Sequence, residues 1–318
     1  MDAGDGLTYD DVAGAYLALD RLDEAKAVIQ QSYARGLDPA GEHLTLYQVH
    51  FLEHDAAGMA KEVAWAMGKT GYEDQFLFVD SSTAASSGLL QHSRDFTDRA
   101  IASAQHADES ETAASYRAAE AFREALFGNA AEAKSEATAA LATSRGENVE
   151  ACAALAYALS GDTTHAQAIA DDLAKRFPGD TVLQYLYLPT IRAEIELAHG
   201  SPLKAIGILQ VSAPYELGEP QSPETPLWPV YFRGMAYLAA HDGASAEVEF
   251  QKILDHPGIV LNLSIGSLAH LELGRAEALQ GNKRKARAAY QDFFALWQHA
   301  DTGIPILQEA RAEFAKLQ

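Results

Sequence analysis

The stretch from residue 234 to residue 250, GMAYLAAHDGASAEVEF, decides the fold because its pattern returns 40 residues later, over residues 274–290, as GRAEALQGNKRKARAAY. The first copy places a glycine three positions before a tyrosine, and later an alanine four positions before a phenylalanine. Side chains three or four positions apart share one face of a helix. Small residues let the two helices of a hairpin approach closely, and aromatic residues fill the groove to the next hairpin. The sequence therefore predicts repeated pairs of antiparallel helices.

Six earlier segments repeat this frame with varying fidelity, which predicts an array rather than a single hairpin. In the clearest copies a small residue is followed by a turn residue seven positions later and by an alanine five positions further on, as at Ala121, Gly128 and Ala133. A helical hairpin of about 34 residues with this skeleton is typical of the tetratricopeptide repeat (TPR). We expect an all-α fold: a right-handed superhelical TPR solenoid of about eight helix hairpins plus a C-terminal capping helix.

The division of the 318-residue chain follows from these repeats and from its prolines. We assign residues 1–212 to repeats one to six, 213–229 to a proline-rich loop, 230–304 to repeats seven and eight, and 305–318 to the capping helix. Five of the eleven prolines lie in that loop, and no helix survives such a density. Pro189 stands inside an otherwise good helix, so we expect a kink or break there.

Composition limits the classes of partner. The formal net charge is −21, so nucleic acid and anionic lipid surfaces are poor partners. The longest apolar stretch, residues 151–159, is too short to cross a bilayer, and residues 1–6 lack the features of a signal peptide. We expect a soluble segment without direct membrane insertion. Its partner would be a protein or peptide, and the pattern specifies no oligomeric state.

The sequence gives little support for an enzymatic function. No nucleophile, base and orienting group can be assembled, and we expect no cofactor. His50 and His54 are four apart and share a helix face, as metal ligands can. Together with His43 they leave a metal-dependent enzyme as a minor alternative, although no HExxH motif is present. The favoured prediction is that this chain is not an enzyme and holds no metal.

A binding surface is expected on the concave face, which in such arrays is lined by the first, or A, helix of each hairpin. One position per A helix, next to the small residue in most repeats, would contact a peptide in the groove. These candidates are Val49, Phe122, Leu155, Glu194, Met235 and Arg275. The alternative is a small-molecule-sensing TPR domain in which the 213–229 loop covers a pocket, and an enclosed apolar cavity beneath that loop would favour it.

Several stretches are more specific than the general repeat. They include residues 13–19 (AGAYLAL), 21–26 (RLDEAK), 55–60 (DAAGMA), 188–192 (LPTIR), 213–218 (APYELG), 250–256 (FQKILDH), 289–297 (AYQDFFALW) and 304–307 (IPIL). Together they resemble the C-terminal TPR region of large bacterial signalling proteins that are abundant in Acidobacteria. Those proteins usually carry a eukaryotic-like serine/threonine protein kinase domain at the N-terminus, and some relatives carry a winged-helix DNA-binding domain instead, generally followed by a membrane helix.

The resemblance covers essentially the whole chain and has three implications. It implies the sensory or scaffold part of a bacterial signalling protein of the serine/threonine kinase type. It carries no catalytic residue onto this sequence, although the parent protein would be a kinase. It implies a cytoplasmic location or, if a membrane helix precedes this region, a periplasmic or extracytoplasmic one. Glu277 departs from the tyrosine usual at its position, which should weaken packing toward the C-terminal end.

Overall fold

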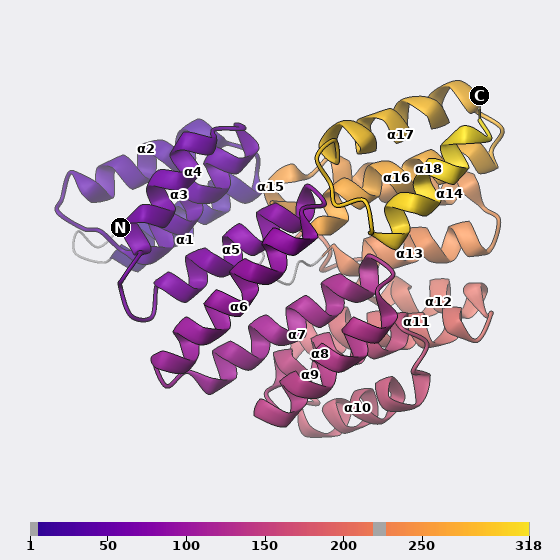
Figure 1. The fold of residues 1–318 in the computed structure, drawn as a ribbon, viewed down its shortest axis with the longest axis horizontal. Coiled ribbons are helices and arrows are strands. Elements are labelled where there is room, and N and C mark those ends of the chain that lie inside the picture. Colours follow the sequence, from indigo (N-terminus) through magenta and orange to yellow (C-terminus); the bar gives the residue numbers. More distant parts are fainter. Residues whose placement is uncertain (1–5, 219–226, 318) are drawn as a thin grey trace.

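Paired helices make up the fold in the computed structural model, which describes residues 6–218 and 227–317. Helices and connecting turns account for both described ranges, and neither range contains a strand. Eight hairpins follow one another along the chain, and a final helix follows the eighth (Figure 1). The predicted all-α TPR solenoid with its C-terminal capping helix is confirmed.

The hairpins have similar lengths and short connections. Their A and B helices are α1 (Gly6–Ala18) with α2 (Leu22–Tyr33), α3 (Ala40–Leu52) with α4 (Ala56–Ala66), α5 (Glu73–Ser86) with α6 (Leu90–His106), α7 (Ser110–Leu126) with α8 (Ala130–Thr143), α9 (Glu147–Leu159) with α10 (Thr163–Arg176), α11 (Leu188–Ala198) with α12 (Pro202–Leu209), α13 (Trp228–Ala239) with α14 (Gly243–Leu254), and α16 (Ser264–Leu279) with α17 (Lys283–Leu296). A one-turn helix, α15 (Pro257–Val260), precedes α16, and the capping helix is α18 (Pro305–Ala315).

The small residues of the repeat lie where the two helices of a hairpin touch. A Cβ added at Gly234 would come within 2.6 Å of the Phe250 ring, and one at Gly274 within 2.8 Å of the Tyr290 ring. These aromatic rings therefore pack against the glycine of their own hairpin, and do not only fill the groove to the next one. This contact explains why small and aromatic residues recur together.

The turn between the helices requires a left-handed backbone conformation. Gly128 adopts it with φ +90°, and the equivalent glycines of four other hairpins, Gly88, Gly161, Gly200 and Gly281, adopt it as well. In other hairpins Asp20 and His241 take the same conformation, with φ 57° and 59°. The predicted role of these turn residues is confirmed, because a left-handed residue commonly ends a helix.

Pro189 changes the helix around it, as predicted. A five-residue π-type turn, Leu183–Tyr187, directly precedes α11, which has the proline in its first turn. Proline lacks the N–H that would continue the α-helical hydrogen bonds. One position further on, the Thr190 hydroxyl donates to the Leu186 carbonyl oxygen at 2.6 Å. The predicted break is therefore a local widening of the helix.

The proline-rich segment contains less loop than expected. Residues 219–226, with Pro220, Pro223 and Pro226, lie outside the described residues. Helix α13 already begins at Trp228, so the expected boundary at residue 229 is too late; Pro229 fits because a first-turn N–H has no partner within the helix. Before the gap, Glu216 is buried and accepts hydrogen bonds from Arg233 (2.5 Å) and Lys252 (2.6 Å). These bonds hold the segment against α13 and α14.

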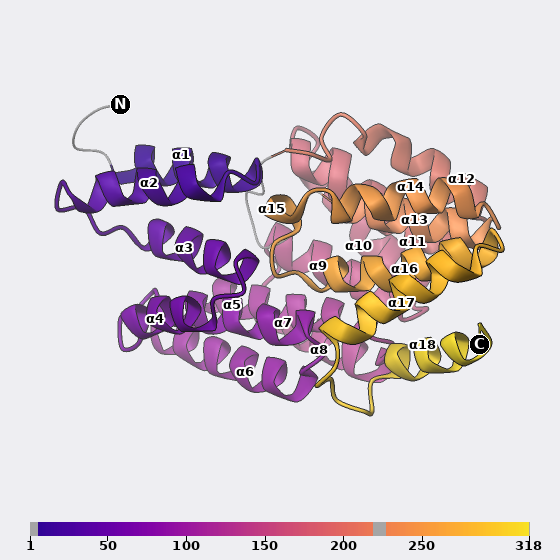
Figure 2. The same ribbon diagram turned by 90° about the horizontal axis from the view of Figure 1, so that it is seen from above.

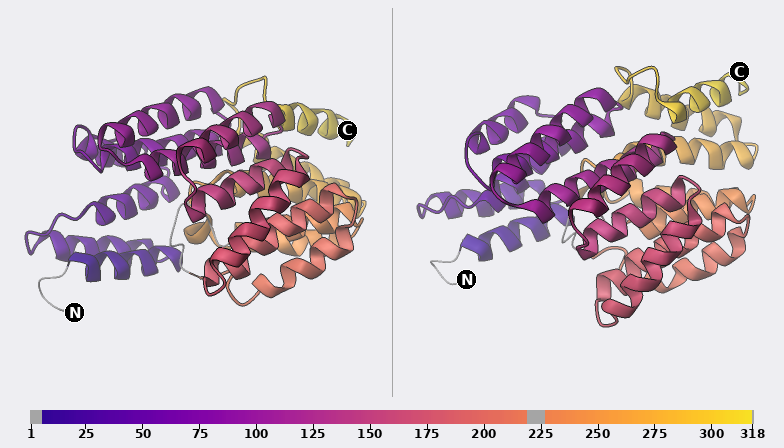
Figure 3. Two further views of the ribbon diagram at one scale, coloured as in Figure 1. Left: turned by 90° about the horizontal axis from the view of Figure 1, so that it is seen from below. Right: turned by 60° about the horizontal axis from the view of Figure 1, so that its bottom comes forward.

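The solenoid closes on itself, which the repeats did not predict. The Trp297 indole N–H donates to the Ser86 carbonyl oxygen at 3.0 Å, and the Ile306 N–H donates to the Phe127 carbonyl oxygen at 3.2 Å. Further along, the Gly258 N–H donates to the Asp20 carboxylate at 2.7 Å. The C-terminal helices thus lie beside the ends of α5 and α7 (Figures 2 and 3). Much of the expected open groove is therefore filled by the chain itself.

Candidate functional site

A pocket of about 380 Å³ remains where the closed solenoid leaves its concave side unfilled. Five A helices and the capping helix form its walls. We call it the carboxylate pocket; its lining residues are Ala125, Leu126, Gly128, Leu159, Glu194, Leu197, Tyr231, Phe232, Met235, Ala239, Glu272, Arg275, Ile306 and Glu309. Residues almost two hundred positions apart thus meet at one site.

The geometry of the hairpins places this pocket at one end of the A helices. Leu126, Leu159 and Ala239 are the last residues of α7, α9 and α13, and Leu197 is the last but one of α11. Because successive A helices run in the same direction, their C-terminal ends gather at the same rim. The first turn of α18 crosses this rim, and the hydrogen bond from the Ile306 N–H to the Phe127 carbonyl oxygen holds it there.

Two carboxyl groups on the pocket wall are deeply buried. Glu194 of α11 is 7% exposed and Glu272 of α16 is 0% exposed. The Glu194 Oε1 and Glu272 Oε2 atoms have no hydrogen-bond partner. Burial penalises the charged form, and it raises the pKa of Glu194 to about 8 and that of Glu272 to about 7. Unpartnered buried carboxyl oxygens of this kind are uncommon and call for an explanation.

Arg275 is the basic residue of the pocket, and carboxylates surround it. Its Nη1 atom donates to Glu272 Oε1 at 2.8 Å, and its Nε and Nη2 atoms donate to the two oxygens of Glu313 at 2.9 and 3.1 Å. The Glu309 Oε2 atom lies 3.6 Å from the Arg275 Nη2 atom. Arg275 therefore faces three carboxylates. Within the residues that the structure describes, Glu194 forms no ion pair with Arg275 or with another basic side chain.

The structure brings three of the six residues expected at the concave face into this pocket. Glu194, Met235 and Arg275 all line it. Val49 and Leu155 have no exposed surface, do not line this pocket and pack between helices. The remaining residue, Phe122, is also buried.

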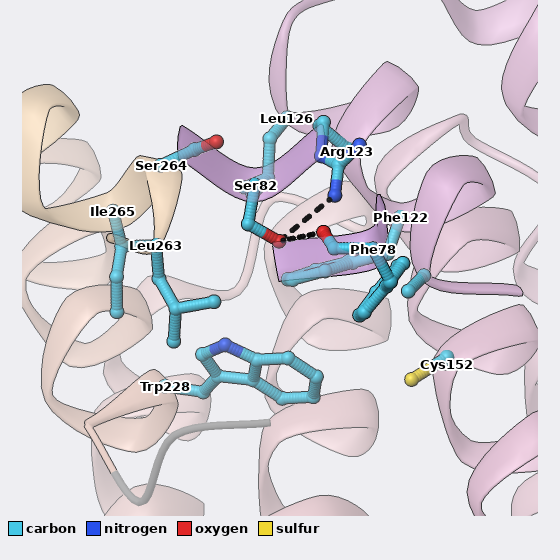
Figure 4. Close-up of a pocket in the computed structure, with 11 residues that line it drawn as sticks. Phe78, Ser82, Phe122, Arg123, Leu126, Cys152, Trp228, Leu263, Ser264 and Ile265 are labelled. Carbon is cyan, nitrogen blue, oxygen red and sulfur yellow. Dashed lines mark hydrogen bonds between the residues drawn. The ribbon is translucent and has the colours of Figure 1, made fainter. Parts of the chain in front are cut away.

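Phe122 belongs to a second, much smaller cavity of about 50 Å³ (Figure 4). Its ring lies 4.5 Å from that of Trp228, which brings the fourth and seventh hairpins together. Arg123 points into the cavity and donates to the Ser82 hydroxyl at 3.3 Å. Space on the scale of a few water molecules cannot admit a peptide. Phe122 therefore serves the closure of the solenoid.

The sequence reasoning missed Glu272, Tyr231 and Glu309. Glu272 lies one helical turn before Arg275, and Tyr231 lies one turn before Met235, so their side chains share a face with predicted residues. Glu272 could have been found from the sequence, because it is an acidic residue between two leucines, Leu271 and Leu273. Glu309 could not be found this way, because the capping helix reaches the pocket only through the closure of the solenoid.

The three histidines of the metal alternative do not come together as a ligand set. His43 is bound between two carboxylates, with Glu62 at 2.5 Å from Nδ1 and Asp38 at 2.8 Å from Nε2, and its ring stacks on Trp65. His50 lies 3.2 Å from Asp55, while His54 occupies a turn with φ 58°. Within residues 6–218 and 227–317, no group of three or more His, Cys, Asp or Glu side chains is placed to hold a metal ion.

The cavity expected beneath the proline-rich segment is of a different kind. Next to residues 211–215 there is an open depression of about 550 Å³ with a mixed polar and apolar lining, where Tyr185 and Tyr215 stack with their ring centroids 4.7 Å apart. It is not an enclosed apolar cavity. Among the described helices, none combines the length and hydrophobicity that a membrane span requires.

Comparisons with known proteins yield likenesses in structure and none in sequence. No protein-family model matches the chain, and no curated protein matches it. The chain is similar to a tetratricopeptide repeat protein from Parabacteroides merdae, with 13% identity, a TM-score of 0.48 and coverage of 87% of this chain and 98% of that one. It is also similar to the P58(IPK) TPR domain, with 12% identity, a TM-score of 0.31 and coverage of 98% and 96%. The fold assignment rests on the hairpins and turns described above.

Proposed function

We propose that this chain is a non-catalytic protein- or peptide-binding module, and that the carboxylate pocket is its contact site. The observation that carries the proposal is the pair of unpartnered buried carboxyl groups, Glu194 and Glu272, in an accessible pocket with apolar walls. A buried polar group without a partner destabilises the fold, and a bound partner can supply the missing hydrogen bonds. Such carboxyl groups are better explained as contacts for a bound partner than as residues that stabilise the core.

The biological setting belongs to the same proposal. The stretches quoted above resemble the TPR region of bacterial signalling proteins of the serine/threonine kinase type. On that basis the module acts as their sensory or scaffold part. Binding in the pocket would then bias the arrangement of the hairpins that form its walls, because a ligand shifts a conformational equilibrium only through its differential affinity.

A selection of displayed random peptides on the whole chain tests the binding role. Ala239 is exposed at the pocket wall, so Ala239→Trp fills the pocket without disturbing the core. We expect selected peptides to bind this variant at least tenfold more weakly. The matched control is Ala244→Trp, an exposed position of α14 that does not line the pocket, and it should leave affinity unchanged. Peptides that bind both variants equally well would contradict the proposed site.

A small-molecule sensor is the second candidate. The pocket volume lies within the range of about 300–1,000 Å³ that is common for small-ligand sites. Such a ligand would contact the walls between α11, α13 and α16 and not the proline-rich segment. The Ala239→Trp variant blocks this role as well, whereas a peptide longer than the pocket would also respond to changes in residues outside it.

A further inference from the structure

We propose that the carboxylate pocket recognises an organic cation, namely the side chain of a lysine or arginine in the bound peptide. The charged head would lie within reach of Glu194 and Glu272, and the aliphatic arm would lie against Leu197 and Met235. This inference rests on the proposed function and specifies the chemistry that the site selects.

The first step of the argument is the missing donors. Glu194 and Glu272 both line the pocket, and the buried Glu194 Oε1 and Glu272 Oε2 atoms accept no hydrogen bond from the residues that the structure describes. Both helices flank α13, and both carboxyl groups act on the same residue, Tyr231. An ammonium group carries three donors and a guanidinium carries five, without any acceptor. Either head can therefore donate to more than one carboxyl oxygen.

The second step is the sign of the local charge. Above about pH 8, where Glu194 and Glu272 are ionised, four carboxylates, those of Glu194, Glu272, Glu309 and Glu313, stand against the single guanidinium of Arg275. Arg275 already donates to Glu272 and Glu313, so it does not attract a further anion. A ligand with a carboxylate or phosphate would meet repulsion here, whereas a cation lowers the electrostatic energy.

The third step is the direction of the helices around the pocket. The C-terminal ends of α7, α9, α11 and α13 meet at its rim, and the C-terminal end of a helix favours positive charge. The opposing helix end, the first turn of α18, is partly neutralised because the Ile306 N–H already donates to the Phe127 carbonyl oxygen. Helix ends and side chains thus favour the same sign of ligand.

The last step is the apolar wall. Leu126, Leu197, Phe232 and Met235 line the same space as the carboxyl groups. Lysine and arginine bury their aliphatic stems along apolar surface while the charged head keeps its polar contacts. A metal ion would not use such a wall. An amine with an alkyl chain matches both halves of the site.

The first experiment compares hexylammonium with hexanol, its neutral counterpart, by calorimetric titration of the whole chain. We expect hexylammonium to bind at least tenfold more tightly. Glu194→Gln should remove most of this preference, and Glu272→Gln should reduce it. The matched control is Glu196→Gln, on the same helix but facing Lys204 outside the pocket, and it should preserve the preference. Met235→Trp should weaken both probes, and it remains informative if a charge variant misfolds.

The pH dependence of hexylammonium binding adds an independent readout. Burial raises the pKa of Glu194 to about 8, and Tyr231, Glu272, Arg275, Glu309 and Glu313 are the other titratable groups at or beside the pocket. A bound cation favours the ionised carboxylate, so binding releases protons and should be at least threefold tighter at pH 8.5 than at pH 6. Glu194→Gln should flatten this profile. Equal binding of both probes, or a charge preference unchanged in Glu194→Gln, would overturn the proposal.

Short blocked peptides separate the source of the cation and separate this inference from the proposed function. Peptides with one central lysine should bind more tightly than hexylammonium if the pocket serves a protein partner; the reverse order would assign it to a free amine and overturn the peptide assignment. Selected peptides could bind the Ala239→Trp variant more weakly and yet contain no basic residue. In that case the proposed binding role stands and the cation inference fails.

Discussion

The N-terminal hairpins and the rest of the molecule are built from the same repeat but are stabilised differently. In α1–α4 the buried residues form two small clusters, one around Tyr9 and Ile29 and the other around Leu17 and Val49. From Ala85 onward, most of the buried residues belong to one large core that extends to the capping helix, and a separate cluster around Phe78, Ile101 and Tyr116 lies between α5, α6 and α7. Repeats that contact only their neighbours have local cores. The comparison shows that closure of the solenoid, and not the repeat itself, creates the large core.

The contacts that close the solenoid explain this difference. Trp297 reaches from the last hairpin to the third, and its ring also packs against Phe127 with centroids 5.1 Å apart. The first hairpin has a smaller link to the C-terminal part, where the Gly258 N–H donates to Asp20. The two regions should therefore respond differently when either link is removed.

Trp297→Ala should have the largest effect. The side chain is buried, and its removal should lower the free energy of unfolding by about 3–5 kcal/mol, as for other large aromatic residues in cores. Trp65→Ala in α4 is the comparison, because that ring is only half-buried against His43, and it should cost roughly half as much. Denaturant unfolding of both variants measures the difference. Equal losses would mean that closure adds no special stability.

Gly258→Ala should loosen the N-terminal region selectively. A Cβ at this position would lie 2.0 Å from the Leu17 carbonyl oxygen, a backbone atom that cannot move alone. We expect a loss of about 1–3 kcal/mol, as for other overpacked sites, with faster amide exchange in residues 6–33 than in 264–296. Gly266→Ala is the control, since its Cβ would meet only Val260 at 3.5 Å. Similar amide exchange in the Gly258→Ala and Gly266→Ala variants would show that α15 does not link the first hairpin to the C-terminal part.

His43 should make the N-terminal region sensitive to alkaline pH. Burial lowers the pKa of His43, but its bonds to Glu62 and Asp38 outweigh this effect and raise the pKa overall. Its stabilisation is therefore complete below about pH 6.5 and is lost as pH rises through the raised value. Between pH 6 and pH 9 we expect residues 40–66 to lose about 1–2 kcal/mol of protection, measured by amide exchange corrected for its intrinsic pH dependence. A His43→Gln variant with an unchanged profile would contradict this assignment.

Glu194→Gln should change the stability in the opposite direction. The raised pKa of Glu194 means that its contribution to stability is complete below the ordinary carboxyl value and is lost as pH rises through about 8. The amide copies the protonated form, so at pH 9 the variant should be more stable than the natural chain by several kcal/mol, since each unit of pKa shift is worth about 1.4 kcal/mol, and at pH 5 the difference should be much smaller. Urea unfolding at both pH values, with Glu196→Gln as control, measures this. A destabilised variant at pH 9 would show that the carboxylate has an unrecognised partner.

The hairpins could be predicted from sequence because their determinants are local. A glycine at position 128 ends one helix, and small residues such as Gly234 face an aromatic ring of the same hairpin. The break at Pro189 could be predicted for the same reason, because a proline disturbs the helix in which it lies. The closure could not be predicted, because it depends on small rotations between successive hairpins that add up over the array. Ser86 and Trp297 are 211 residues apart, and no repeat pattern relates them.

The candidate site, like the fold, could be predicted only where its determinants are local. Glu194, Met235 and Arg275 follow the small residue of their repeats, and that local register places them on the face that lines the pocket. Val49 and Leu155 follow the same logic, but neighbouring helices cover them. Whether an A-helix residue faces a ligand or another hairpin is decided by contacts between distant repeats.

The bond between Trp297 and Ser86 also bears on how the chain is synthesised. The third and fourth hairpins leave the ribosome roughly ten to forty seconds before residue 297 does, at translation rates of about 5–20 residues per second. During that interval the surface of α5 and α7 that later receives the indole ring stays uncovered. A chaperone that shields apolar helices would act on the nascent chain in this window, and its release would await the last hairpin.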